Sequence, residues 1–155
     1  MRIILAVLAL SLLLAACSPA ATAPAAARTG PDAARALVQT FGGRLQYVAL
    51  LAPDAAAQIQ AQYAEFVTPG LLAAWMADPL QAPGRLTSSP WPDRIEIDAV
   101  HLINSGLYNI VGRVIEITNA EVDTDKAAAS YAVSLTVAQT DGVWLISDYQ
   151  VIEGP

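Results

Sequence analysis

The sequence predicts an α+β domain in which three amino-terminal helices pack on a four-stranded antiparallel meander. Three observations support this class. Apolar residues recur every three or four positions between residues 32 and 77, which is typical of amphipathic helices. From residue 94 onward, long runs rich in β-branched residues are separated by turn signals. Asp141-Gly142 is the strongest short hairpin signal in the chain. Helices that precede a hairpin-linked sheet pack on one of its faces.

The helical half divides at its capping and breaking residues. A first helix is expected over residues 32–51, with Asp32 at its start, Gly42-Gly43 as a kink or a close approach to another element, and Pro53 as its end. A second is expected over residues 54–65, opened by Asp54. Thr68-Pro69 is a cap followed by proline, so a third helix is expected over residues 69–77.

Prolines and glycines mark residues 79–93 as a long loop without a regular element. Four strands are expected over residues 94–104, 107–119, 129–140 and 143–152. Ser105-Gly106 and Asp141-Gly142 are expected to be two-residue turns of the first and last hairpins.

The first residues have the layout of an export signal. Met1-Arg2 provides a positive charge, and residues 3–14 are almost entirely apolar but too few to span a bilayer as a resident helix. The segment ends Leu14-Ala15-Ala16-Cys17, which closely resembles the lipobox of bacterial lipoproteins. This resemblance implies cleavage between Ala16 and Cys17, a diacylglycerol on the Cys17 thiol, and often a further acyl chain, such as palmitate, on the new amino terminus. An ordinary signal peptide with a chance cysteine is the alternative.

The expected organisation is a signal peptide over residues 1–16, a lipidated cysteine with an Ala/Pro-rich tether over residues 17–31, and a folded domain over residues 32–155. Two or more acyl chains give stable membrane attachment. The domain is then extracytoplasmic, on the outer face of the plasma membrane; because residue 18 is serine, the outer membrane is expected in a two-membrane cell. The single cysteine excludes an intramolecular disulfide. The net charge of −6, with no basic stripe, argues against nucleic acid as a partner and against attraction to anionic lipid.

Within residues 32–152 the order of elements and the closing run at residues 141–148 resemble the nuclear transport factor 2-like superfamily. Residues 87–97 also resemble a signature of uncharacterised bacterial lipoproteins of this shape. The resemblance implies a cone-shaped domain whose curved sheet wraps around a helix and leaves a pocket. The superfamily includes both enzymes and non-catalytic accessory domains, so the fold alone decides nothing about activity.

Uninterrupted hairpin registers place His101 and Asp148 on otherwise apolar sheet faces. With Tyr131 and Gln150 they form the candidate pocket. One interpretation is a proton-transfer pair, because catalytic members of the superfamily use a carboxylate and an imidazole and because burial raises the pKa of a carboxylate. The other is a satisfied histidine near a sheet end and an aspartate at an open rim. Glu116 is the one further strong acid on the predicted face of His101.

The proline-rich loop is the candidate interaction surface, through Arg85, Trp91 and Asp93. Trp91 is either an interface anchor or a plug for the open end of the cone. Asp98 and Arg113 are expected to pair across strands on the solvent face. Neither a metal nor another cofactor is expected. The acidic run at residues 121–125 lacks the glycine and closing glutamate of a calcium loop, one histidine and an acylated cysteine do not suit zinc, and no serine-hydrolase elbow occurs.

The sequence therefore favours a lipid-anchored, non-catalytic binding or accessory module of the cell envelope that acts on an envelope protein or a small apolar ligand. The alternative is a small-molecule isomerase or dehydratase that uses Asp148 and His101.

Overall fold

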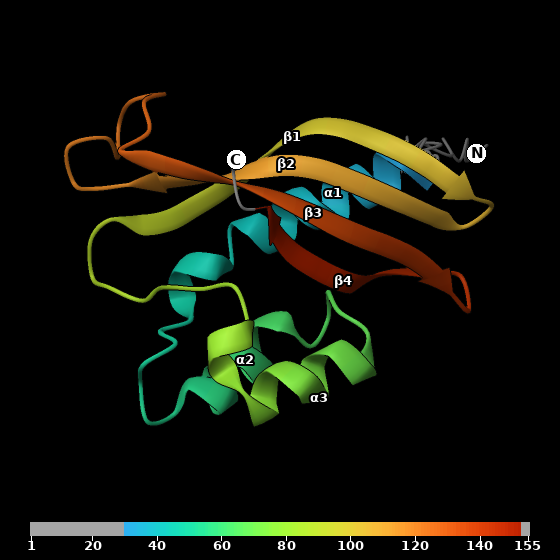
Figure 1. Ribbon diagram of the computed structural model, residues 1–155, viewed down its shortest axis with the longest axis horizontal. Coiled ribbons are helices and arrows are strands. Elements are labelled where there is room, and N and C mark those ends of the chain that lie inside the picture. The colour runs from blue at the N-terminus through green and yellow to red at the C-terminus, as the bar shows by residue number, and fades with distance from the viewer. Residues whose placement is uncertain (1–29, 153–155) are drawn as a thin grey trace, which may run out of the picture.

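The computed structural model describes residues 30–152, which form helices followed by an antiparallel sheet (Figure 1). The elements, in chain order, are α1 (Gly30–Gly42), the 3-10 turn η1 (Leu45–Tyr47), α2 (Ala55–Tyr63), α3 (Pro69–Ala77), the 3-10 turn η2 (Pro79–Gln81), β1 (Trp91–Asn104), β2 (Leu107–Ile117), β3 (Ala129–Thr140) and β4 (Val143–Ile152). The sheet order is β1-β2-β3-β4, so the predicted α+β class with a four-stranded meander is confirmed. None of the helices in residues 30–152 is long and apolar enough to cross a membrane.

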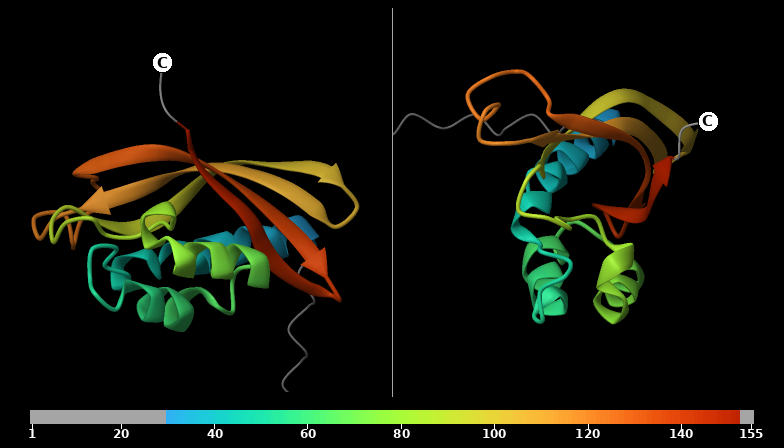
Figure 2. Two further views of the ribbon diagram at one scale, coloured as in Figure 1. Left: turned by 60° about the horizontal axis from the view of Figure 1, so that its bottom comes forward. Right: turned by 60° about the vertical axis from the view of Figure 1, so that its left-hand side comes forward.

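The sheet bends over α1, and all three helices lie on the same side of it (Figure 2). Helix α1 packs against β1, β2 and β4, while α2 and α3 pack against each other beside it. The chain between α2 and α3 joins the edge strand β4, because Thr68 N donates to Ile146 O at 2.9 Å and Ile146 N donates to Phe66 O at 2.8 Å. The helical half is thus hydrogen-bonded to the last strand of the meander.

Helix α1 is shorter than expected, since it ends at Gly42 instead of residue 51. The glycine pair is the cause. A Cβ on Gly42 would lie 2.6 Å from the backbone nitrogen of Ile95, so β1 approaches the helix where a side chain is missing. The expected close approach is confirmed. Helix α3 has the predicted bounds, and α2 is close to its predicted range.

The core is an aromatic cluster that joins the helices to the sheet. The Phe41 ring lies 5.0 Å from that of Tyr63 and 6.3 Å from that of Trp75. The Trp75 ring in turn meets Tyr149 of β4 edge-on at 6.2 Å. Because α1, α2, α3 and β4 each contribute a ring, burial of these large side chains ties all four elements into one core.

Strand β1 departs from the uninterrupted register at three bulges, which insert Asp93, Asp98 and Ile103. Each bulge shifts the following residues to the opposite face. Ile95 and Ile97 pack inward as expected, but after Asp98 it is Val100 that packs on the core. His101 pairs with Asn109 and is exposed on the outer face. The predicted apolar face for His101 is wrong.

A bulge at Ser147 likewise shifts the following residues of β4 to the opposite face of the sheet. Ile146 lies opposite buried Val137, but the next inward residue is Tyr149, which lies opposite buried Leu135. Asp148 pairs with Thr136 on the outer face and is half-buried there. The expectation that Asp148 shares the core face of Ile146 is therefore wrong as well.

The long loop is shorter than predicted at its carboxyl end. Strand β1 begins at Trp91, which pairs with Ile117, so Trp91 and Asp93 belong to the sheet and not to the loop. The loop also holds the short turn η2, stabilised where Leu80 N donates to Asp78 Oδ1 at 3.3 Å. Of the three candidate interaction residues, Arg85 alone remains in the loop.

Candidate functional site

His101 and Asp148, the expected proton-transfer pair, both lie on the outer face of the sheet but on opposite edge strands. His101, Asn109, Thr136 and Asp148 are partners in one row across the four strands. Three strand spacings, roughly 14 Å, therefore separate His101 from Asp148. Neither residue lines the cavity described below, and the Asp148 carboxylate accepts a hydrogen bond from Gln150 Nε2 at 2.9 Å. The geometry does not bring the pair to a common ligand atom.

A cavity of about 860 Å³ lies between the loop that follows α3 and the inner face of the sheet. This is within the range of small-molecule sites. The loop wall comprises residues 80–87 and Pro90, and Leu50 lies beside it. The sheet wall comprises Glu116, Tyr131, Tyr149, Gln150 and Val151. Tyr131 and Gln150 are predicted pocket residues that line this cavity, although the Gln150 side chain bonds Asp148 on the outer face.

Arg85 is held in the loop wall by its backbone. Its N–H donates to Val48 O at 2.8 Å and its carbonyl accepts from Leu50 N at 2.9 Å, which forms a short parallel bridge. Gly84 permits this approach, since a Cβ there would lie 2.8 Å from Val48 O. The Arg85 side chain has no hydrogen bond or ion pair with residues 30–152, and its Nε is buried without a partner.

A second orphaned polar atom belongs to the sheet wall. Tyr149 Oη is buried and faces the Tyr131 hydroxyl, to which it can donate, but the two groups are not well aligned for a hydrogen bond. Burial, and then Tyr131, raise the pKa of Tyr149 well above its ordinary value. Burial also raises the pKa of Tyr131; the interaction with the Tyr149 hydroxyl partly offsets this rise, and the negative charge of Glu116 adds to it. Glu116, Tyr131 and Tyr149 therefore form one polar cluster on the inner face.

Exposed aliphatic side chains border this cavity. Leu80 is 58% exposed, Leu86 59% and Val151 54%, and all three line it. Large exposed aliphatic side chains that gather around a concave site are typical of binding surfaces. The cavity thus combines an unpaired guanidinium, a carboxylate and two tyrosines with an apolar border.

The loop wall is joined to helix α2 by a buried hydrogen bond at Pro83. Tyr63 Oη donates to Pro83 O at 2.7 Å, and both groups are buried. Burial raises the Tyr63 pKa far above its ordinary value. The hydroxyl is therefore a neutral donor throughout the physiological range, and it holds the loop wall over the cavity.

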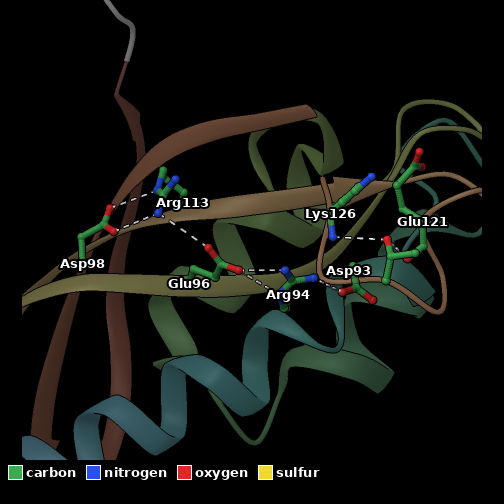
Figure 3. Close-up of polar contacts among 8 residues, drawn as sticks. Asp93, Arg94, Glu96, Asp98, Arg113, Glu121 and Lys126 are labelled. Atoms are coloured by element: carbon green, nitrogen blue, oxygen red, sulfur yellow. Dashed lines mark hydrogen bonds and ion pairs between the residues drawn. The ribbon is translucent and has the colours of Figure 1, made fainter. Parts of the chain in front are cut away.

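The outer face of β1 and β2 carries an ionic ladder, defined here as Asp93, Arg94, Glu96, Arg113 and Asp98 (Figure 3). Arg94 bridges Asp93 at 2.8 Å and Glu96 at 2.7 Å. Arg113 reaches Asp98 at 3.2 Å, which confirms the expected pair, although its register partner is Glu96. Partly exposed pairs of this kind are each worth a fraction of a kcal/mol. Asp93 therefore has a structural role as an ion-pair partner of Arg94.

Other sequence candidates are also placed. Trp91 is half-buried at the start of β1 and is not among the residues that line the cavity. In the acidic run at residues 121–125, the Glu121 carboxylate accepts hydrogen bonds from Thr118 N at 2.8 Å and from Thr118 Oγ1 at 2.6 Å.

Residues 30–152 contain no group of three potential metal-ligating side chains. Ala16 and Cys17 lie outside the described residues.

No protein-family model matches this chain, and no curated protein matches it by sequence. Among solved structures, the chain is similar to the intermembrane space region of the chloroplast protein ARC6 at 15% identity and a TM-score of 0.43, over 78% of this chain and 92% of that one.

Proposed function

We propose that this protein is exported, cleaved before Cys17 and anchored to a membrane by acyl chains on that cysteine. The support is the order of a positive start, a short apolar run and Leu14-Ala15-Ala16-Cys17. Two or three acyl chains would hold an acidic domain at a surface that does not attract it electrostatically. The domain then works on the extracytoplasmic side.

We further propose that the domain belongs to the nuclear transport factor 2-like class and serves as a non-catalytic binding module of the cell envelope. The helices precede the meander, and the sheet bends over α1, as that class requires. The observation that carries a binding role is the cavity, where Arg85 and Tyr149 each leave a buried polar atom unpaired. Unpaired buried groups are costly, so a site that retains two of them favours a ligand that completes them.

Mass spectrometry of the protein purified from bacterial membranes tests the anchor. We expect a chain that starts at Cys17 and carries acyl chains on that residue. A Cys17→Ser variant should remain an uncleaved precursor, while a Ser18→Ala variant should be processed as the wild type is. An unmodified thiol, or retention of residues 1–16 in the wild type, contradicts the anchor.

A further inference from the structure

We propose that the cavity binds an amphiphilic organic acid with one negative charge: its acid group lies against Arg85 and Tyr149, and its apolar body lies against Leu80, Leu86 and Val151. This inference rests on the proposed binding role of the cavity and names the class of ligand. No metal and no covalent step are involved.

The charge of the ligand follows from Arg85. An arginine is positively charged at any physiological pH, and this one has no carboxylate partner among residues 30–152. Carboxylate oxygens form short, charge-assisted hydrogen bonds with a guanidinium. The backbone bridge to Val48 and Leu50 fixes the main chain at Arg85, so only the side chain has to be ordered when a ligand binds.

The two orphaned atoms are shielded from solvent, so a ligand reaches them only when the side chains of Arg85 and Tyr149 reorient. An acid group can drive this movement because both atoms gain a partner. The Tyr149 hydroxyl is protonated, as burial raises its pKa, and so it can donate to the same acid. We therefore expect binding to be accompanied by a local rearrangement at these two residues.

Glu116 limits the charge of the ligand. Its carboxylate lines the same cavity and has no ion pair or side-chain hydrogen bond within the described range. A second negative charge on the ligand would meet this carboxylate in a partly desolvated space, where repulsion is stronger than in water. A single acid group avoids that cost. The exposed Leu80, Leu86 and Val151 then favour an apolar body and not a small inorganic anion.

Four probes of equal chain length separate these contributions: octanoate, octanamide, octylammonium and octanedioate. We would titrate each into the mature acylated protein held in phosphatidylcholine nanodiscs, measure binding by calorimetry, and subtract titrations into empty nanodiscs. We expect octanoate to bind at least about tenfold more tightly than octanamide, because the charge-assisted bond is lost in the amide. Octylammonium and octanedioate should bind more weakly than octanoate.

Substitutions test which residues cause the preference for octanoate over the other probes. Arg85→Met should remove the advantage of octanoate over octanamide, whereas Arg35→Met, which removes an arginine of α1 that does not line the cavity, should keep it. Glu116→Gln should reduce the difference in affinity between octanedioate and octanoate. Circular dichroism verifies the fold of each variant, and the wild-type probe series remains decisive if one fails to fold.

The outcomes distinguish the ligand class from the binding role. If octanamide binds as tightly as octanoate, or Arg85→Met leaves the ratio unchanged, the acid is wrong while the binding role stands. If octylammonium binds best, Glu116 sets the charge preference and the inference is overturned. If none of the four binds, both the ligand class and the binding role of the cavity fail.

Discussion

A single buried hydroxyl group fixes the loop wall of the cavity to the helical core. Tyr63 Oη donates to Pro83 O at 2.7 Å, and both groups are shielded from water. A Tyr63→Phe variant keeps the ring contacts with Phe41 and Trp75 but leaves that carbonyl without its donor. We expect a loss of about 1–3 kcal/mol in the free energy of unfolding, measured by urea denaturation.

The matched control is Tyr47→Phe, because Tyr47 is 55% exposed and its hydroxyl forms no hydrogen bond with the described residues. Its stability should stay within about 0.5 kcal/mol of the wild type. An equal loss in the free energy of unfolding in both variants would show that the hydrogen bond from Tyr63 to Pro83 does not stabilise the fold.

The buried tyrosines also predict how stability depends on pH. The pKa values of Tyr63, Tyr131 and Tyr149 are all raised above 10.0 by burial. Their folded forms hold the proton while the unfolded chain releases it, so the unfolded state binds fewer protons above pH 10. Their contribution is fully present below that pH and is lost as the pH rises. Urea denaturation between pH 8 and 11 should show this decline, with a shallower slope in Tyr63→Phe; a stability that rises with pH would contradict it.

How well each site residue could be predicted from the sequence depends on the regularity of the strand or loop in which it lies. Arg85 could be selected from the sequence because it lies among loop-forming prolines and glycines. Tyr131 could be selected because β3 itself has no inserted residue, so Tyr131 keeps the face of Val133 and Leu135 that plain alternation predicts. Tyr149 was missed and Asp148 selected in its place, since one inserted residue at Ser147 exchanges their faces. Nothing in the sequence indicates that Arg85 lacks a partner, because that depends on the tertiary position of every carboxylate.

At the scale of elements, the turn and breaker residues determined the boundaries well. The bounds of α3, β3 and β4 agree with the sequence prediction, and each is bordered by proline, glycine or aspartate. The bulges of β1 and β4 were missed. A signal for them does exist, since the apolar spacing changes from Ile95 and Ile97 to Val100, and from Ile146 to Tyr149. Such a change of phase within one strand indicates a bulge.

The bulge at Asp98 depends on a glycine in the neighbouring strand. A Cβ on Gly112 would lie 2.3 Å from Glu96 O, and that atom belongs to the backbone. Gly112→Ala must therefore displace β1 or remove the bulge. We expect a loss of more than about 2 kcal/mol in the free energy of unfolding, as for other severe steric changes in a core.

Gly70→Ala is the matched control, since an added Cβ there meets nothing within 4 Å in helix α3. Alanine is favoured over glycine in a helix, so this variant should be neutral or more stable by up to about 1 kcal/mol. Similar stabilities for the two variants would show that the bulge tolerates a side chain at position 112.

At the scale of the whole molecule, the two sheet edges are protected in different ways. The ionic ladder and three bulges make β1 a charged and bent edge, which disfavours pairing with another chain. Strand β4 is bridged at one position by the link between α2 and α3, where Val67 pairs with Ile146. The two edges of the described sheet therefore differ: β1 is charged and bent, and β4 is joined to the helical half.

The buried core predicts how the protein unfolds once the segment before the domain is removed. One hydrophobic cluster contains residues from all three α-helices and all four strands, and its first member is Ala34. A chain that starts at Gly30 retains this entire cluster, and Gly30 itself lies against Tyr108 and Trp144. We expect it to unfold in one cooperative transition, with coincident urea curves by far-ultraviolet circular dichroism and tryptophan fluorescence. The chain has three tryptophans, Trp75 in α3, Trp91 in β1 and Trp144 in β4. A Trp75→Phe variant therefore reports the sheet, and a Trp91→Phe/Trp144→Phe double variant reports the helical half. Separate transitions in these two variants would mean that the helices and the meander are independent units. Coincident transitions would mean that the helices and the meander unfold as one packed unit, as the shared core cluster predicts.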